Sequence, residues 1–156
     1  MNQAKVLNFF GLLLIMFGVS FSVPLFVAVL YEESLVTVFG LGMSILVGLG
    51  FLSWFFTKNN KQELSLSDGF VITVLFWVVL SVSGSIPFIL FGFSVVDSFF
   101  ESMSGITTTG ATVVTGLDDL PRSLLIYRQL LQWLGGMGLI VLAIAVMPLL
   151  GIGGGQ

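Results

Sequence analysis

The sequence predicts an all-α polytopic membrane protein with four transmembrane helices, one re-entrant helix and an extended loop. Of its 156 residues, 56% are hydrophobic and 8% are charged, whereas soluble domains carry roughly 25% charged residues. The mean hydropathy is +1.12. Four apolar stretches are each long enough to cross a hydrocarbon core of about 30 Å as a helix. A lipid bilayer is therefore the expected environment of this chain.

The residue types that are missing exclude several kinds of chemistry. The chain contains no His and no Cys, so Ser-His and Cys-His catalytic pairs, zinc sites built on imidazole or thiolate, haem ligation and disulfides are excluded. Its net charge of -3 comes from 5 basic and 8 acidic residues, which supports no nucleic-acid surface. We therefore expect no catalytic residue, no cofactor in this chain, and membrane lipid rather than nucleic acid as a partner.

The four apolar stretches cover residues 6–30, 35–57, 69–91 and 122–150. The first two belong to an amino-terminal part, residues 1–67, and the other two lie within residues 68–156. Pro87 interrupts the third stretch near its end, which a membrane helix tolerates when neighbouring groups satisfy the freed carbonyl. Asp118 and Asp119 precede the fourth stretch, where carboxylates favour the positive end of a helix. This stretch also contains glycines that indicate close helix packing, namely Gly135, Gly136 and Gly138.

Basic residues set the expected orientation. They lie before the first stretch and between the second and third, at Lys5, Lys58 and Lys61. Cytoplasmic loops are enriched in basic residues, so the amino terminus is predicted to be cytoplasmic. The segment between the third and fourth stretches then faces outside. Arg122 lies on this outer side, and we expect its long side chain to snorkel toward the membrane surface.

Residues 95–106 are predicted to form a short helix that enters the membrane without crossing it. Apolar runs of about 10 to 14 residues are more typical of re-entrant segments than of spans. Ser94 and Asp97 form a capping-box pattern at its start. The next residues, 107–112, are rich in β-branched Thr, which disfavours helix and favours an extended path. The chain is therefore expected to turn outward after this helix.

An extended backbone at membrane depth must line a cavity or pack within protein, because hydrocarbon leaves its polar groups unpaired. Carbonyl and hydroxyl oxygens are the ligands that replace water around a monovalent cation. The carboxyl end of the short helix also carries a partial negative charge. The run from Thr107 to Thr112 therefore predicts a cation filter, and an ordinary Thr-rich outer loop is the alternative.

Two acidic residues, Asp97 and Glu101, share one face of the short helix because they are four positions apart. A carboxylate at membrane depth is a functional hypothesis that needs a named partner. We expect Glu101 to pair with Arg128 of the fourth stretch and to support the pore from behind the filter. In the alternative, Glu101 contacts outer water. Asp97 is expected to serve only as a helix cap.

Four groups of residues resemble a known family. They are Gly105-Ile106-Thr107-Thr108-Thr109-Gly110-Ala111-Thr112, Leu120-Pro121-Arg122-Ser123, Tyr127-Arg128-Gln129 and Gln132-Trp133-Leu134-Gly135-Gly136-Met137-Gly138. Together they are similar to the first pore repeat of the TrkH and KtrB potassium-uptake proteins, from about residue 68 to the end. Two additional helices before this repeat make TrkH the closer resemblance.

The resemblance implies a potassium-translocating subunit of the bacterial inner membrane, in which four non-identical repeats of helix, pore loop and helix surround one pathway. By position, Thr108, Thr109 and Gly110 match the family's first filter strand, with Thr107 and Ala111 flanking it. Potassium is then the transported substrate. The resemblance also implies a homodimer with a cytoplasmic nucleotide-binding regulatory subunit. The loop lacks the Tyr and second Gly of the channel sequence Thr-Val-Gly-Tyr-Gly, so discrimination against sodium stays open.

One repeat does not close a ring of carbonyls, which needs four walls. The other three come either from the rest of a longer chain or from further copies in a homotetrameric cation channel. We favour the longer chain, because residues 151–156 contain no charged cytoplasmic stop. An intramembrane serine protease is an alternative of another class, suggested by Ser102, Ser104 and Gly105. It fails because His is absent and the Lys residues lie near cytoplasmic boundaries.

Overall fold

The computed structural model describes residues 2–60 and 63–150, and its regular elements there are all helices. Four of the resulting segments are long and apolar enough to cross a membrane, with α1 and α2 counted as one. This confirms the predicted fold class. In order, the elements are α1 (Gln3–Ser20), α2 (Ser22–Leu30), α3 (Leu35–Thr57), α4 (Leu66–Phe91), α5 (Val95–Ile106), η1 (Leu117–Asp119), α6 (Arg122–Val146) and η2 (Met147–Leu150).

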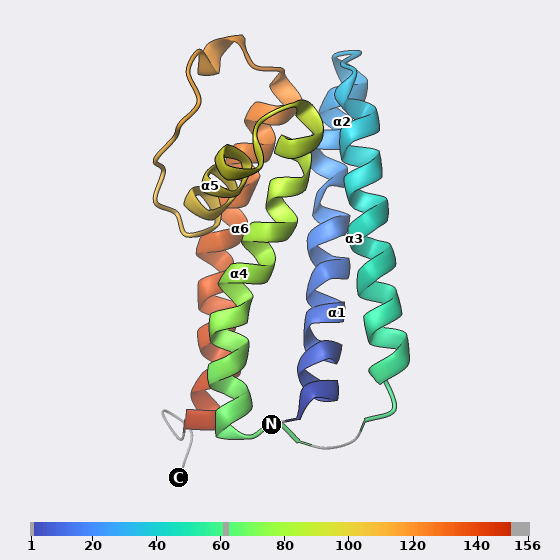
Figure 1. Cartoon of the computed structure of the whole chain (residues 1–156), viewed down its shortest axis with the longest axis vertical. Coiled ribbons are helices and arrows are strands. Elements are labelled where there is room, and N and C mark those ends of the chain that lie inside the picture. The colour runs from blue at the N-terminus through green and yellow to red at the C-terminus, as the bar shows by residue number, and fades with distance from the viewer. Residues whose placement is uncertain (1, 61–62, 151–156) are drawn as a thin grey trace.

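The described chain begins and ends at the same end of the bundle. In Figure 1 the start of α1 and the end of α6 lie at the bottom, whereas the hairpin between α2 and α3 lies at the top. The short helix α5 descends from the top and packs on α4 and α6. The loop after it climbs back to the start of α6. This path is the re-entrant excursion that the sequence predicts.

The first predicted span consists of two helical pieces that meet at Phe21. Pro24 has no backbone N–H, so the carbonyl of Ser20 loses its partner four residues on. At the junction the N–H of Phe21 bonds to the carbonyl of Gly18, three residues back, at 3.1 Å, while the Ser20 hydroxyl donates to the carbonyl of Phe17. The side chain of Phe21 is fully buried. The span therefore continues through a local irregularity, to which the missing N–H of Pro24 contributes.

Helices α1 and α3 approach each other closely where glycines face each other. A Cβ atom on Gly11 would lie 2.8 Å from the carbonyl oxygen of Gly50, and one on Gly50 would lie 2.6 Å from that of Gly11. Real side chains do not tolerate such distances, so both positions require glycine. Small residues allow helix backbones to meet in this way in a membrane.

Helix α4 begins at Leu66, three residues before the predicted start at 69. Ser65 and Asp68 form a reciprocal capping box, in which Asp68 N–H bonds to Ser65 Oγ at 3.3 Å and Ser65 N–H bonds to Asp68 Oδ2 at 2.9 Å. The other carboxylate oxygen of Asp68 accepts the N–H of Asn2 at 2.9 Å. Asp68 therefore caps its own helix and ties it to the start of α1.

Candidate functional site

The short helix α5 lies where the sequence predicts it, at about residues 95–106. Its N-cap is Ser94, whose hydroxyl accepts the N–H of Asp97 at 3.1 Å. The Asp97 side chain is exposed, and within the described residues its carboxylate makes no hydrogen bond back to the Ser94 N–H, so only the Ser94 half of the predicted capping box is present. The side of the helix that faces α4 and α6 is buried and polar. It contains Ser98, Glu101 and Ser102, whereas Asp97, one turn before Glu101, lies at the exposed start of the helix.

Close contacts hold α5 between its two neighbours. On the α4 side, a Cβ on Gly84 would overlap the hydroxyl of Ser102. On the α6 side, a Cβ on Gly105 would lie 3.0 Å from Cβ of Leu131. A Cβ on Gly135 of α6 would overlap the carbonyl oxygen of Ile106, the last residue of α5. Interior close packing makes such positions sensitive to one added carbon, so the carboxyl end of α5 is held in place by α6.

The three predicted packing glycines of α6 differ in their surroundings. Gly135 contacts α5, as described, and a Cβ on Gly138 would lie 3.0 Å from the ring of Phe76 on α4. At Gly136, the nearest atom to an added Cβ is the Thr108 methyl at 3.7 Å, an ordinary contact distance. Packing therefore requires glycine at Gly135, whereas a side chain at Gly138 would need the Phe76 ring to shift slightly.

Helix α5 ends in a Schellman motif, in which a residue with positive φ lets the next N–H groups bond back to the helix. Thr109 N–H bonds to the carbonyl of Ser104 at 2.9 Å, and Thr108 N–H bonds to that of Gly105 at 2.9 Å. Thr108 has a φ of 56°, which is unfavourable for a β-branched residue. The structure thus corrects the prediction of an extended path from 107 onward, because the last helical carbonyls require donors.

The predicted filter residues fall into two groups. Thr108, Thr109 and Gly110 are exposed, and no hydrogen bond to their carbonyl oxygens occurs within the part of the chain that the structure describes. The Thr107 hydroxyl donates to the Met103 carbonyl at 2.7 Å. The Ala111 carbonyl accepts the Ser104 hydroxyl at 2.6 Å, so it faces α5.

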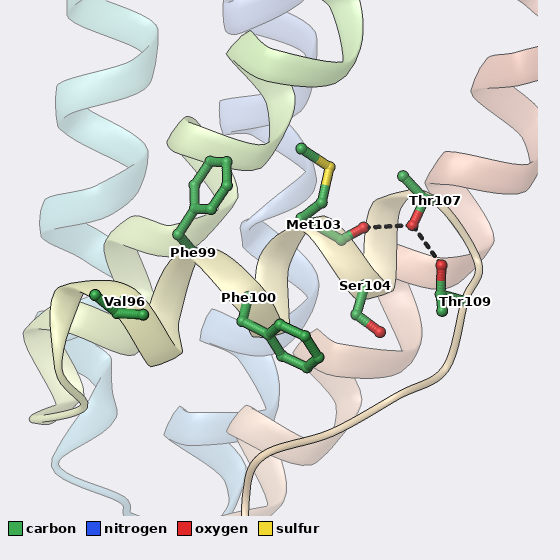
Figure 2. A pocket seen from close by; sticks show the side chains of 7 residues that line it. All are labelled: Val96, Phe99, Phe100, Met103, Ser104, Thr107 and Thr109. Atoms are coloured by element: carbon green, nitrogen blue, oxygen red, sulfur yellow. Dashed lines mark hydrogen bonds between the residues drawn. The ribbon is translucent and has the colours of Figure 1, made fainter.

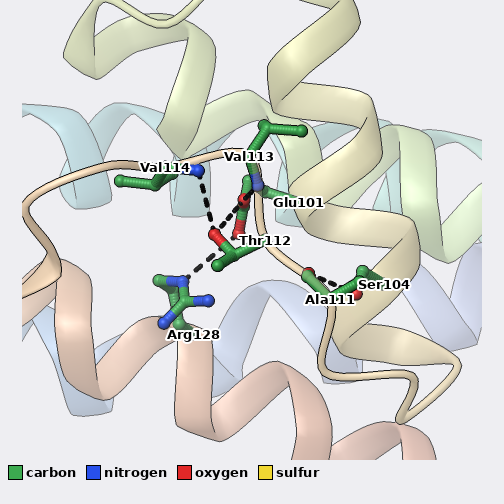
Figure 3. A network of polar contacts seen from close by, with 7 residues as sticks. All are labelled: Glu101, Ser104, Ala111, Thr112, Val113, Val114 and Arg128. Atoms are coloured by element: carbon green, nitrogen blue, oxygen red, sulfur yellow. Dashed lines mark hydrogen bonds and ion pairs between the residues drawn. The ribbon is translucent and has the colours of Figure 1, made fainter.

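A buried ion pair lies behind the loop (Figure 3). Glu101 Oε2 is 3.3 Å from Nε of Arg128, and the exposed fractions of the two side chains are 1% and 12%. Glu101 Oε1 accepts the Val113 N–H at 2.8 Å and the Thr112 hydroxyl. The contact predicted between Glu101 and Arg128 is therefore present, and the alternative contact with outer water is wrong. Sequence reasoning missed the bonds to Thr112 and Val113, because loop conformation decides them.

An apolar pocket of about 310 Å³ lies beside the start of the loop (Figure 2). The hydroxyls of Thr107 and Thr109 form a hydrogen bond of 2.8 Å at the edge of this pocket. Its lining residues are Val96, Phe99, Phe100, Met103, Ser104, Thr107 and Thr109. In the described residues, no group of three or more His, Cys, Asp or Glu gathers where it could bind a metal ion. The oxygen atoms available at the loop are thus carbonyls and hydroxyls, which suit an alkali cation.

The start of α6 departs from the prediction. Asp118 and Asp119 belong to η1, and within the described chain neither carboxylate bonds to α6. The acceptor is instead Glu33 of the α2–α3 hairpin, which bonds to the first residues of α6. Arg122 does not simply snorkel, because its guanidinium donates to the Tyr31 hydroxyl at 3.1 Å and lies 4.5 Å from the ring centroid.

Comparison with known proteins agrees with this architecture. The family model of TrkH, described as a cation transport protein, matches residues 36–156. The chain belongs to the TrkH family. It is an integral membrane protein of a family of cation transport proteins, not of enzymes.

Individual TrkH relatives are similar along the whole chain. The Trk system potassium uptake protein TrkH of Vibrio parahaemolyticus is 48% identical over 159 residues, which cover 100% of this chain and 33% of the relative. TrkH of Escherichia coli K12 is 43% identical with the same coverage, and TrkG of that organism is 42% identical over 94% of this chain and 31% of its own length. The chain thus spans about a third of the curated relatives that it matches.

A solved structure has the same fold. The crystal structure of the potassium transporter TrkH from Vibrio parahaemolyticus superimposes with a TM-score of 0.90 at 48% identity. The match covers 100% of this chain and 34% of that chain. The arrangement of four spans and one re-entrant helix is therefore that of the matching third of a TrkH structure.

Proposed function

We propose that this chain contributes one of four filter strands to a potassium uptake protein of the bacterial inner membrane. The ion ligands in this proposal are the carbonyl oxygens of Thr108, Thr109 and Gly110. The observation that carries it is a set of exposed residues at the end of a re-entrant helix whose carbonyls accept no hydrogen bond among the described residues, with a buried ion pair behind them. The names of its relatives, potassium uptake proteins, supply the substrate.

The electrostatics of the loop favour a cation. The carboxyl end of α5 carries roughly half a negative charge, and the loop begins directly at this end. Carbonyl dipoles that bond to no protein donor can take the place of water around a potassium ion. Thr107 and Ala111 flank these ligands, and their hydrogen bonds to α5 make them anchors of the loop.

Glu101 and Arg128 support the pore in this proposal. Glu101 accepts hydrogen bonds from Thr112 and Val113 just beyond the ligands, while Arg128 balances its charge. Groups that lie behind a coordinating shell fix the orientation of the ligands, as second-layer partners do in metal sites. The ion pair is accordingly assigned to positioning and not to contact with potassium.

The partners in this proposal follow from the family. The other three repeats belong to the remainder of a longer polypeptide, since the matched relatives extend well beyond this chain. Homotetramer formation by separate copies has no support from those relatives. The complete protein is expected to form a homodimer that binds a cytoplasmic nucleotide-binding regulatory subunit. The described Lys residues, Lys5 and Lys58, favour a cytoplasmic amino terminus.

A matched pair of glycine substitutions tests the filter. Gly110 and Gly116 have φ values of 78° and 70°, so alanine meets a similar left-handed backbone cost of about 1–2 kcal/mol at each. In the complete transporter, Gly110→Ala is expected to abolish potassium-limited growth of cells that lack their own uptake systems, whereas Gly116→Ala preserves it. Equal growth and equal potassium flux in both variants would contradict the assignment of the filter.

A further inference from the structure

The α2–α3 hairpin places a carboxylate on a helix that begins far along the chain. Glu33 Oε1 accepts the N–H of Arg122 at 2.8 Å, while Oε2 accepts both the N–H of Ser123, at 3.2 Å, and its hydroxyl. The N-cap of α6, Pro121, makes no side-chain hydrogen bond of its own. The free N–H groups of a helix start require acceptors, and here the hairpin supplies them.

The backbone conformation of the hairpin holds Glu33 in this position. Glu32 has a φ of 53° and terminates α2 as the left-handed residue of a Schellman motif. The N–H of Glu33 bonds back to the carbonyl of Ala28 at 2.9 Å. The negative charge of Glu33 also lies at the positive end of the α6 dipole, which is favourable. The guanidinium of Arg122 bonds to Tyr31.

Helix α6 carries the groups that hold the loop. Arg128 lies six residues after Arg122, or about 9 Å along the helix axis, and pairs with Glu101. Further along, Leu131 and Gly135 contact the last residues of α5. A helix is stiff over this length, so a displacement of its first turn also displaces Arg128.

We propose that Glu33 is a positioning residue for the filter. It fixes the first turn of α6, and through Arg128 it fixes Glu101 and the part of the loop that Glu101 binds. This inference rests on the proposed function, because it needs an ion to be coordinated by the loop. The amino-terminal helices thereby set the ion affinity of a pore repeat to which they contribute no ligand.

Glu32 offers a matched control. Glu32→Gln and Glu33→Gln each remove one negative charge from the same hairpin, but of these two glutamates only Glu33 has a hydrogen bond to α6 in the described part of the chain. Both variants are made in the complete transporter in membranes. Hydrogen exchange of the first turn of α6 is measured together with the KM and Vmax of rubidium uptake and the rubidium-to-sodium flux ratio.

Glu33→Gln is expected to accelerate exchange at Arg122 and Ser123 about fivefold, as loss of a helix cap does. It is expected to raise the KM for rubidium roughly threefold to tenfold and to lower the rubidium-to-sodium flux ratio, while Vmax is retained. Glu32→Gln is expected to change none of these quantities. Unchanged exchange would show that Glu33 does not fix the first turn of α6 and overturns the proposal. Faster exchange with unchanged KM and flux ratio shows a structural cap only and overturns the positioning role.

Two further results distinguish a failure of the positioning role of Glu33 from a failure of the proposed function. Failure of the unmodified transporter to take up rubidium or potassium contradicts the proposed function, whatever the exchange data show. If Glu33→Gln does not accumulate in membranes, Ser123→Ala removes one of the three donors to Glu33 and must raise KM in the same direction. An unchanged KM in that variant overturns the positioning role.

Discussion

The two halves of the candidate filter loop are held by different kinds of interaction. Residues 107–109 continue from α5 mainly through backbone hydrogen bonds to helical carbonyls, and the Thr107 hydroxyl adds one bond to the Met103 carbonyl. Residues 111–113 have no such bonds and are held by side chains, namely Ser104 and Glu101. Backbone bonds leave the side-chain identity free, whereas side-chain bonds require particular residues. Substitutions should therefore affect the two halves unequally.

The largest effect is expected at the returning half, from Glu101→Leu. This variant leaves Arg128 without a partner and Val113 N–H without an acceptor, and breaking a buried pair costs about 3–5 kcal/mol. Thermal unfolding of the detergent-solubilised transporter measures the loss, and potassium uptake should be lost with it. Asp97→Asn, at the exposed start of the same helix, is the control and should change neither property.

The double variant Glu101→Leu, Arg128→Leu sharpens the same comparison. Replacing both partners of a buried pair by apolar residues recovers stability in many proteins. We expect thermal stability to return while potassium selectivity does not, since Val113 N–H still lacks its acceptor. Recovery of selectivity would show that the returning half does not need Glu101.

At the descending half, Gly135→Ala should destabilise the protein by about 2–3 kcal/mol, because the added Cβ overlaps the Ile106 carbonyl oxygen. The end of α5 must then move, and both the unfolding temperature and the uptake rate should fall. Gly136→Ala is a neighbouring control with an ordinary 3.7 Å contact to the Thr108 methyl. Equal unfolding temperatures for the two variants would contradict the tight contact.

A smaller effect is expected from Ser104→Ala, which releases the Ala111 carbonyl. Loss of one hydrogen bond of this kind costs about 1 kcal/mol. Denaturation should show that loss, and the KM for potassium should rise because Ala111 is no longer anchored. Ser44→Ala, whose hydroxyl bonds only within its own helix to the Gly40 carbonyl at 2.8 Å, should leave KM as it is.

The smallest effect should come from Thr108→Gly, and its sign should be opposite. Glycine adopts the φ of 56° without steric cost, so relief of the left-handed Thr stabilises the helix end by up to about 1 kcal/mol. The unfolding temperature should rise slightly while uptake continues, because the carbonyl remains. A fall in stability would mean that the Thr108 side chain holds the loop.

Local sequence signals predicted much of this architecture. The apolar stretches located the spans, and the Ser94 cap with the apolar run after it located α5. Glu101 and Arg128 were paired from their charge and membrane depth alone, since a buried charge needs a partner. The sequence indicated that carbonyl oxygens would be the ligands, but it did not indicate which carbonyls stay unbonded. The β-branched Thr residues predicted an extended chain from residue 107, whereas Thr108 takes a positive φ and the next N–H groups bond back to α5.

Residue order along the chain was sufficient for the membrane environment, the helices and the chemical character of the loop, because these depend on composition and short spacings. Tertiary packing alone decided which acceptor covers the start of α6. Nearby Asp118 and Asp119 were the local candidates, yet the hairpin brings Glu33 there from 89 residues away. The same holds for Ser104 and the Ala111 carbonyl: a hydrogen bond depends on where two groups meet in space, and the folded chain, not their order in the sequence, sets that distance.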